Sequence, residues 1–142
     1  MGADIFMMVE KKEEEAWCLV KNTSWKYNVI SLDRNSVMFA ILSGFRNQNF
    51  EEIKPISHAK GLPTDMSKEV ACWMEDLSHC SFLSLEEINS FDWTKECELF
   101  DEKGAYREFA KEFYEQVVLY LNNIKKSGTD EGDLRIVFGY SM

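Results

Sequence analysis

The chain is poor in the residues that break regular structure, with two prolines and seven glycines among 142 residues. This scarcity excludes low-complexity linkers and collagen-like repeats. No window of 18 apolar residues occurs, so we expect no membrane-spanning helix. Lysine and arginine number 16 against 25 aspartates and glutamates, which gives a formal charge of -9. Because phosphate backbones repel such a chain, we do not expect direct binding to duplex DNA or RNA.

Export signals and paired cysteines are also missing. The first residues place their apolar run before their lysines, which is the reverse of the order in a secretory signal. The four cysteines are scattered without a Cys-x-x-Cys pair, at Cys18, Cys72, Cys80 and Cys97. These features predict reduced thiols and a cytoplasmic protein.

Apolar residues make up 45% of the chain and aromatic residues 13%, which is enough for the core of one domain, 1–142. Apolar β-prone runs at 3–10 and 17–20 predict an N-terminal hairpin, and 134–140 predicts a final strand beside 3–10. Apolar spacing and N-cap residues predict helices over 34–46, 67–77 and 84–90, and a long helix over 104–126. Residues 22–31 stay ambiguous, and 47–66 is expected to be a loop. The expected fold is α+β: a small antiparallel or mixed sheet covered by several helices.

Each of the two terminal strands carries one charge that we expect to be buried, Asp4 in 3–10 and Arg135 in 134–140. Asp4 falls in an apolar strand and needs a partner if it is buried. Arg135 is the candidate, because a guanidinium satisfies both carboxylate oxygens. The pair is expected to fix the strand register, with a catalytic Asp4 as the alternative.

Two Arg-Asn pairs flank the predicted helix 34–46. Guanidinium groups bind phosphate and carboxamides bind base edges, so Arg34-Asn35 and Arg46-Asn47 could hold an anion or a nucleotide. The alternative is a capping role for Asn35 and surface ion pairs for the arginines. The candidate ligand-binding residues, with the histidines and the terminal arginine included, are Arg34, Asn35, Arg46, Asn47, His58, His79 and Arg135.

Two further interpretations concern metal and acidity. His79-Cys80 with Asp4 and Asp76 could coordinate zinc, although an exposed histidine beside a buried cysteine explains the same residues. We predict no tightly bound zinc and no cofactor, because compact ligand spacing is missing. Runs such as Glu13-Glu14-Glu15 and Glu51-Glu52 could mimic a nucleic acid, or could only solvate the surface.

Several segments, taken in order along the chain, carry a resemblance to a known family. They are Met1-Gly2-Ala3-Asp4-Ile5-Phe6, Arg34-Asn35 through Leu42 with Arg46-Asn47, Gly61-Leu62-Pro63, Ser78-His79-Cys80-Ser81 and Arg135-Ile136-Val137-Phe138. Together they resemble a family of small uncharacterised proteins from bacteriophage and bacterial genomes that open with Met-Gly-Cys-Asp-Ile-His. Where that family has histidines, this chain has Phe6, Ser78 and Cys80. The departures favour binding over catalysis.

The resemblance implies a phage setting without an established activity. We therefore expect a small phage-encoded protein of the host cytoplasm that counteracts a defence system, by sequestering a nucleotide-derived signal or by binding a host protein. The alternatives are a metal-dependent phosphodiesterase or other hydrolase built on Asp4, His79 and Cys80, and an acidic nucleic-acid-mimicking inhibitor. A homo-oligomer is possible, and no membrane partner is expected.

Overall fold

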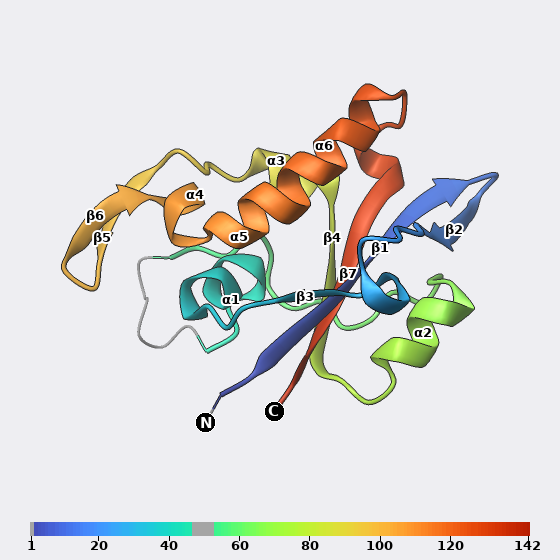
Figure 1. The fold of residues 1–142 in the computed structure, drawn as a ribbon, viewed down its shortest axis with the longest axis horizontal. Helices are drawn as coiled ribbons and strands as arrows, with labels where there is room; N and C mark the ends of the chain where they lie inside the picture. The colour runs from blue at the N-terminus through green and yellow to red at the C-terminus, as the bar shows by residue number, and fades with distance from the viewer. Residues whose placement is uncertain (1, 47–52) are drawn as a thin grey trace.

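An antiparallel sheet built on the two ends of the chain runs through the middle of the molecule (Figure 1). The computed structural model describes residues 2–46 and 53–142. In it β1 (Asp4–Glu13) pairs with β7 (Leu134–Ser141), and β4 (Ser78–Ser84) pairs with the other edge of β7. The free edge of β1 pairs with β2 (Ala16–Leu19) and with β3 (Ile30–Leu32). The predicted N-terminal hairpin and its pairing with the final strand are confirmed.

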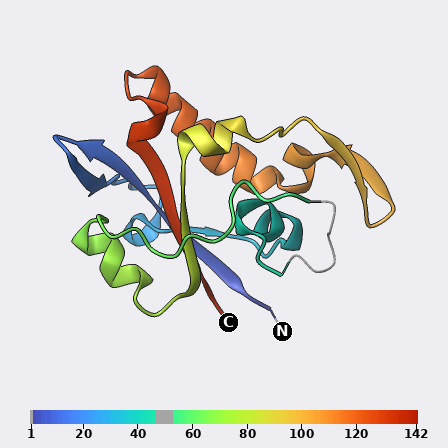
Figure 2. The same cartoon turned by 180° about the vertical axis from the view of Figure 1, so that it is seen from behind.

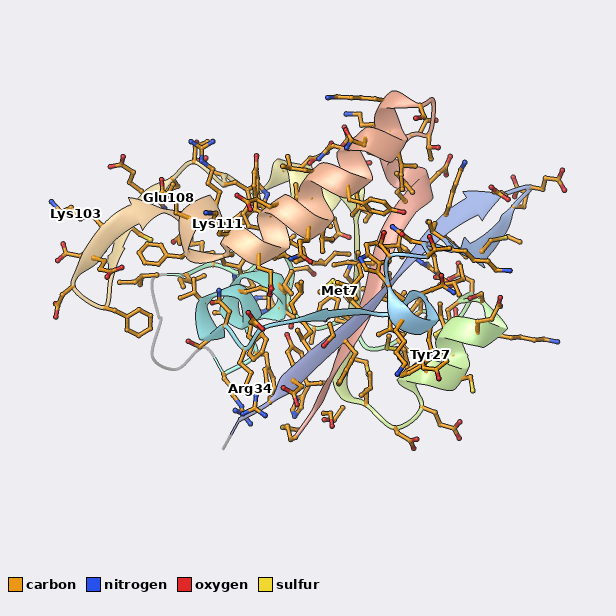
Figure 3. The ribbon with its side chains drawn as sticks, in the orientation of Figure 1. Met7, Tyr27, Arg34, Lys103, Glu108 and Lys111 are labelled. Atoms are coloured by element: carbon orange, nitrogen blue, oxygen red, sulfur yellow. The ribbon has the colours of Figure 1, made fainter. Side chains whose placement is uncertain are left out.

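The two faces of this sheet are covered by different helices. One face carries the main core, where Ile5, Met7 and Phe138 are fully buried beneath α1 (Ser36–Ser43) and the helical chain 106–126. The other face carries Met8 and Val137, which pack on α2 (Lys68–Met74). Figure 2 shows α2 from behind, and in Figure 3 Met7 lies between the layers. Burial on both faces explains the nearly continuous apolar sequence of β1 and β7.

The helices begin at the caps that the sequence predicts. The side chains of Asn35 and Ser67 accept hydrogen bonds from the backbone N–H groups of Met38 and Val70 and so cap α1 and α2. Ser84 and Glu87 form a reciprocal capping box at the start of α3 (Leu85–Ser90). These bonds satisfy N–H groups that have no partner within the helix. The α+β fold class is therefore confirmed.

The single helix predicted over 104–126 is wrong in its first part. Residues 104 and 105 belong to β6 (Glu102–Ala105), which forms a hairpin with β5 (Glu96–Leu99). The chain then forms α4 (Tyr106–Phe109), breaks at Ala110, and continues as α5 (Lys111–Phe113), the π-helical η3 (Tyr114–Val118) and α6 (Leu119–Lys126). At the break, where Ala110 has φ -112° and ψ 39°, the Phe109 carbonyl accepts a hydrogen bond of 2.7 Å from the Asn35 side chain. That carbonyl is thus bonded to α1 at the point where the helix is interrupted.

Several elements lie outside the sequence predictions. These are β4, the β5–β6 hairpin and the short 3-10 turns η1 (Lys26–Asn28) and η4 (Glu131–Asp133). The segment 22–31, ambiguous in sequence, contains η1 and the first two residues of β3. Across the described ranges, no helix has both the length and the apolar character to cross a membrane.

The predicted Asp4–Arg135 pair is wrong, and the strand register explains why. Antiparallel pairing of β1 with β7 sets Asp4 opposite Ser141 and Glu10 opposite Arg135. The Arg135 guanidinium lies 2.7 Å from Glu10 Oε1 through Nη2 and 3.0 Å from Asp65 Oδ1 through Nη1. Asp4 instead pairs with Arg34, 2.9 Å away, at the surface. The buried ion pair exists, but its carboxylate is Glu10.

Candidate functional site

A cleft of about 450 Å³ opens where the end of α1 meets β4 and the last residue of the chain. We call it the Arg46 cleft. The described residues that line it come from the end of α1 and its turn, the loop after residue 53, β4 and the C-terminus: Ser43, Gly44, Phe45, Arg46, Ala59, His79 and Met142. Its only charged side chain among these is Arg46, and none is acidic. In a chain of charge -9, such a lining is unusual.

The turn after α1 sets one wall of the Arg46 cleft. Gly44 adopts a left-handed conformation with φ 75°, and its N–H donates to the Ala40 carbonyl, which ends the helix. The following residues, Phe45 and Arg46, turn away from the helix axis. The loop is held against α1 by a 2.7 Å bond from the Ile56 N–H to the Ile41 carbonyl. In the sequence, this wall is indicated by Gly44, which directly precedes Phe45 and Arg46.

A β-bulge in β4 sets the opposite wall. Ser78 pairs with Tyr140 and Ser81 with Phe138, so β4 holds one more residue than β7 between these partners. His79 lies in this bulge and is exposed, while the Cys80 thiol donates to the Leu77 carbonyl at 3.5 Å. A Cβ atom on Gly139 would lie 2.6 Å from Cys80 Sγ. The bulge thus requires a glycine at position 139, and it directs His79 toward the cleft.

Both basic residues of the cleft have unfavourable backbone conformations. Among the described non-glycine residues, most positive φ angles occur in adjacent pairs in turns, at Glu14–Glu15, Tyr27–Asn28 and Phe100–Asp101. Arg46 (φ 55°) and His79 (φ 50°) are the other two, and the residue after Arg46 lies outside the described residues. Such a conformation costs about 1–3 kcal/mol per residue and is concentrated at functional sites. Both strained residues line the Arg46 cleft, which makes this cleft the candidate functional site.

Aromatic rings support the basic groups. The Phe45 ring stacks on Tyr140 with centroids 4.0 Å apart and planes at 21°. The Arg46 guanidinium carbon lies 5.1 Å from the Phe45 centroid, and the His79 ring lies 4.9 Å from it. Tyr140 is itself fully buried beside Ser43, and burial raises the pKa of its phenol. The arrangement offers a guanidinium, an imidazole and an aromatic surface to one ligand.

The structure brings together only part of the predicted binding set. Arg46 and His79 line the cleft, and Ala59, the neighbour of His58, lines it in place of the exposed His58. Arg34 lies before α1 and bonds Asp4, which lowers the pKa of that carboxyl (Figure 3). Asn35 caps α1, as the structural alternative proposed.

Two members of the predicted set remain. Arg135 is 4% exposed and packs 3.8 Å from the Trp17 ring centroid, so its guanidinium is committed to the interior. Asn47 lies outside the described residues.

The residues of the hydrolase alternative are not assembled. The Asp4 carboxylate binds Arg34, while the His79 ring packs beside Phe45. Burial raises the pKa of the Cys80 thiol, so it is not an activated nucleophile. Within residues 2–46 and 53–142, no group of three or more His, Cys, Asp or Glu side chains is placed to hold a metal ion.

Sequence reasoning missed Phe45, Met142 and Gly139. Phe45 continues the apolar spacing of the predicted first helix, so the sequence assigns it to the core and not to a cleft. Met142 and Gly139 carry no local signal, because their roles arise only when β7 lies beside β4. No protein-family model, curated protein or solved structure matches this chain.

Proposed function

We propose that this chain is a small binding protein that captures a nucleotide-derived anion in the Arg46 cleft. The carrying observation is that Arg46 and His79, each with a positive φ angle, converge on one cleft beside the Phe45 ring, and none of its described lining side chains is acidic. A guanidinium beside an imidazole suits a phosphate group. The Phe45 ring, which is itself stacked on Tyr140, adds an apolar surface beside them for the base.

The dimensions agree with a ligand of this class. A cleft of about 450 Å³ falls among those that hold small ligands and cofactors. In the phage setting that the family resemblance implies, stoichiometric capture of a nucleotide signal would silence a host defence pathway. The nearest described thiol, that of Cys80, has a pKa raised by burial, so it is not an activated nucleophile. Binding is therefore favoured over turnover.

Calorimetric titration with cyclic di-AMP, ADP-ribose and ATP tests the proposal, together with mass spectrometry of molecules released by heating the purified protein. Arg46→Ala should weaken the nucleotide that binds best by about 10- to 150-fold, because a charge-assisted bond to phosphate contributes roughly 1.5–3 kcal/mol. Alanine keeps the Cβ atom, so the backbone strain at position 46 is retained. His79→Asn should also weaken binding, since asparagine tolerates the left-handed backbone but lacks the imidazole.

Arg34→Ala is the matched control. It removes the same charge from a residue that does not line the cleft, and it should leave the dissociation constant within about twofold. The proposal fails if the parent protein binds none of the three nucleotides at millimolar concentration and releases no nucleotide on heating. It also fails if Arg34→Ala and Arg46→Ala weaken binding equally, because the effect would then come from overall charge.

A further inference from the structure

Two large aromatic side chains lie exposed side by side on the far side of the sheet from α1. Trp73 on α2 is 42% exposed and Tyr27 in η1 is 66% exposed, and their ring centroids are 5.9 Å apart. Figure 3 shows Tyr27 beside α2. The buried side of α2 is already used, because Val70 and Met74 pack against Met8 and Val137. Trp73 therefore projects from the helix face that the core does not need.

A second cleft, of about 360 Å³, begins at this tryptophan. We call it the Trp73 cleft, and its described lining residues are Phe6, Cys72, Trp73, Asp76, Leu77 and Ser141. Aromatic rings of Phe6 and Trp73 are thus combined with one carboxylate, that of the exposed Asp76. No described side chain forms a hydrogen bond or ion pair with the Asp76 carboxylate. The lining has the composition of a site for a cation, with rings for its face and a carboxylate for its charge.

The loop that carries Tyr27 is held in place before any partner binds. Tyr27 and Asn28 have φ angles of 58° and 60°, and the Asn28 side chain accepts a 2.8 Å bond from the Asn22 N–H. The Val29 N–H donates to the Lys26 carbonyl at 3.1 Å. Such preorganisation reduces the ordering cost of binding. Lys26 lies 5.5 Å from the Tyr27 centroid, so a cation already faces that ring.

Charge selects the kind of partner. Glu69 on α2 and Glu75 and Asp76 directly after it are exposed, against the exposed Lys26 and Lys68. The surface around the Trp73 cleft is therefore net acidic, as is the whole chain at -9. A second copy would bring the same charges to the interface, and an anionic lipid surface would be repelled as well. A basic protein segment is attracted, and tryptophan, tyrosine and arginine are the residues that dominate binding energy at protein interfaces.

We propose that the Trp73 cleft binds an arginine side chain from a basic segment of a partner protein. The guanidinium lies against the Trp73 indole and donates to the Asp76 carboxylate, and neighbouring partner residues contact Tyr27. The Trp73 cleft is separate from the Arg46 cleft. Its proposed ligand is a cation, whereas that of the Arg46 cleft is an anion. It does not depend on the nucleotide-binding proposal.

The test uses the full chain and a fluorescein-labelled hexa-arginine peptide, with binding followed by polarisation at about 0.3 M NaCl to screen long-range attraction. Trp73→Ala and Asp76→Asn should each weaken binding by roughly tenfold. The matched controls lie at the β5–β6 turn, where Phe100→Ala removes an exposed ring and Asp101→Asn an exposed charge. Both controls should leave affinity within about twofold, and Trp73→Phe should restore part of the affinity that alanine loses.

Several results would overturn this proposal. One is an equal loss of hexa-arginine affinity in Asp76→Asn and Asp101→Asn. It would show that the peptide is attracted by the overall negative charge of the protein and not by Asp76. Another is an unchanged affinity in Trp73→Ala with its native melting transition intact. A third is sedimentation as a dimer that Trp73→Ala converts to a monomer, which would make a second copy the occupant.

Discussion

The Glu10–Arg135 and Asp4–Arg34 pairs contrast a buried and an exposed ion pair within one chain. Glu10 is fully buried and bonds Arg135 Nε at 2.8 Å, and its second oxygen accepts a 2.7 Å bond from the Ser67 N–H. In the second pair, the side chains of Arg34 and Asp4 are 61% and 49% exposed. Water competes for the exposed pair but not for the buried one, so the two should differ in their contribution to stability.

Arg135→Met should lower the free energy of unfolding by about 3–5 kcal/mol, because it leaves the Glu10 carboxylate buried without its cation. Urea denaturation followed by tryptophan fluorescence measures this change. Arg34→Ala is the control and should leave the midpoint nearly unchanged. The double variant Glu10→Leu with Arg135→Met should recover much of the loss, since it removes the unpaired charge. Equal midpoints for the two single arginine variants would contradict this account.

At the scale of elements, two hairpins share the same unfavourable turn. Glu13 pairs with Ala16 and Leu99 with Glu102, which leaves two-residue loops at Glu14–Glu15 and Phe100–Asp101. All four loop residues have positive φ angles. Turns of this kind favour Asn-Gly, because asparagine and glycine adopt the left-handed conformation with little strain.

Glu14→Asn combined with Glu15→Gly should therefore stabilise the protein by about 1 kcal/mol. The measurement is the urea midpoint at an unchanged denaturant slope. Asn and Gly placed at the neighbouring paired positions, in Glu13→Asn with Ala16→Gly, serve as the control, which removes one of the negative charges and not two. It should destabilise, because those residues lie in the strands. A gain from both double variants would show that reduced negative charge, and not turn geometry, is responsible.

For the whole molecule, the position of β7 between β1 and β4 makes the C-terminus essential to the fold. Every residue from Leu134 to Tyr140 is buried, and both faces of the sheet take core residues from this strand. The chain ends lie side by side in the sheet (Figure 1). Folding must therefore join segments from opposite ends of the sequence.

Deleting residues 134–142 should abolish cooperative thermal unfolding and the near-ultraviolet circular dichroism of the tryptophans. The deletion removes the central strand and leaves Glu10 buried without Arg135, while β1 and β4 lose their shared partner. Removal of Ser141 and Met142 alone should preserve the melting transition, since both are exposed. A 134–142 deletion variant with the parent melting temperature would contradict the central role of β7.

The amino-acid sequence by itself determined the α+β class, the terminal strands, the N-terminal hairpin and the starts of α1, α2 and α3. These features depend on neighbouring residues: apolar runs, side-chain spacing and cap residues such as Asn35, Ser67 and Ser84. The sequence also singled out Arg46 as a ligand candidate, because Arg-Asn pairs flank the predicted first helix, and His79 was included in the same set. Their importance for binding stays a prediction.

Only the tertiary structure decided which distant residues meet. The antiparallel register gave Arg135 to Glu10 and left Asp4 to Arg34. A bond from Asn35 to the Phe109 carbonyl marks the break in the long helix, and Gly139 opposite Cys80 admits the bulge that turns His79 toward Phe45. Each of these contacts joins residues far apart in the chain. Local periodicity carries no information about such pairs, because register and bulges are settled by packing and pairing across the whole sheet.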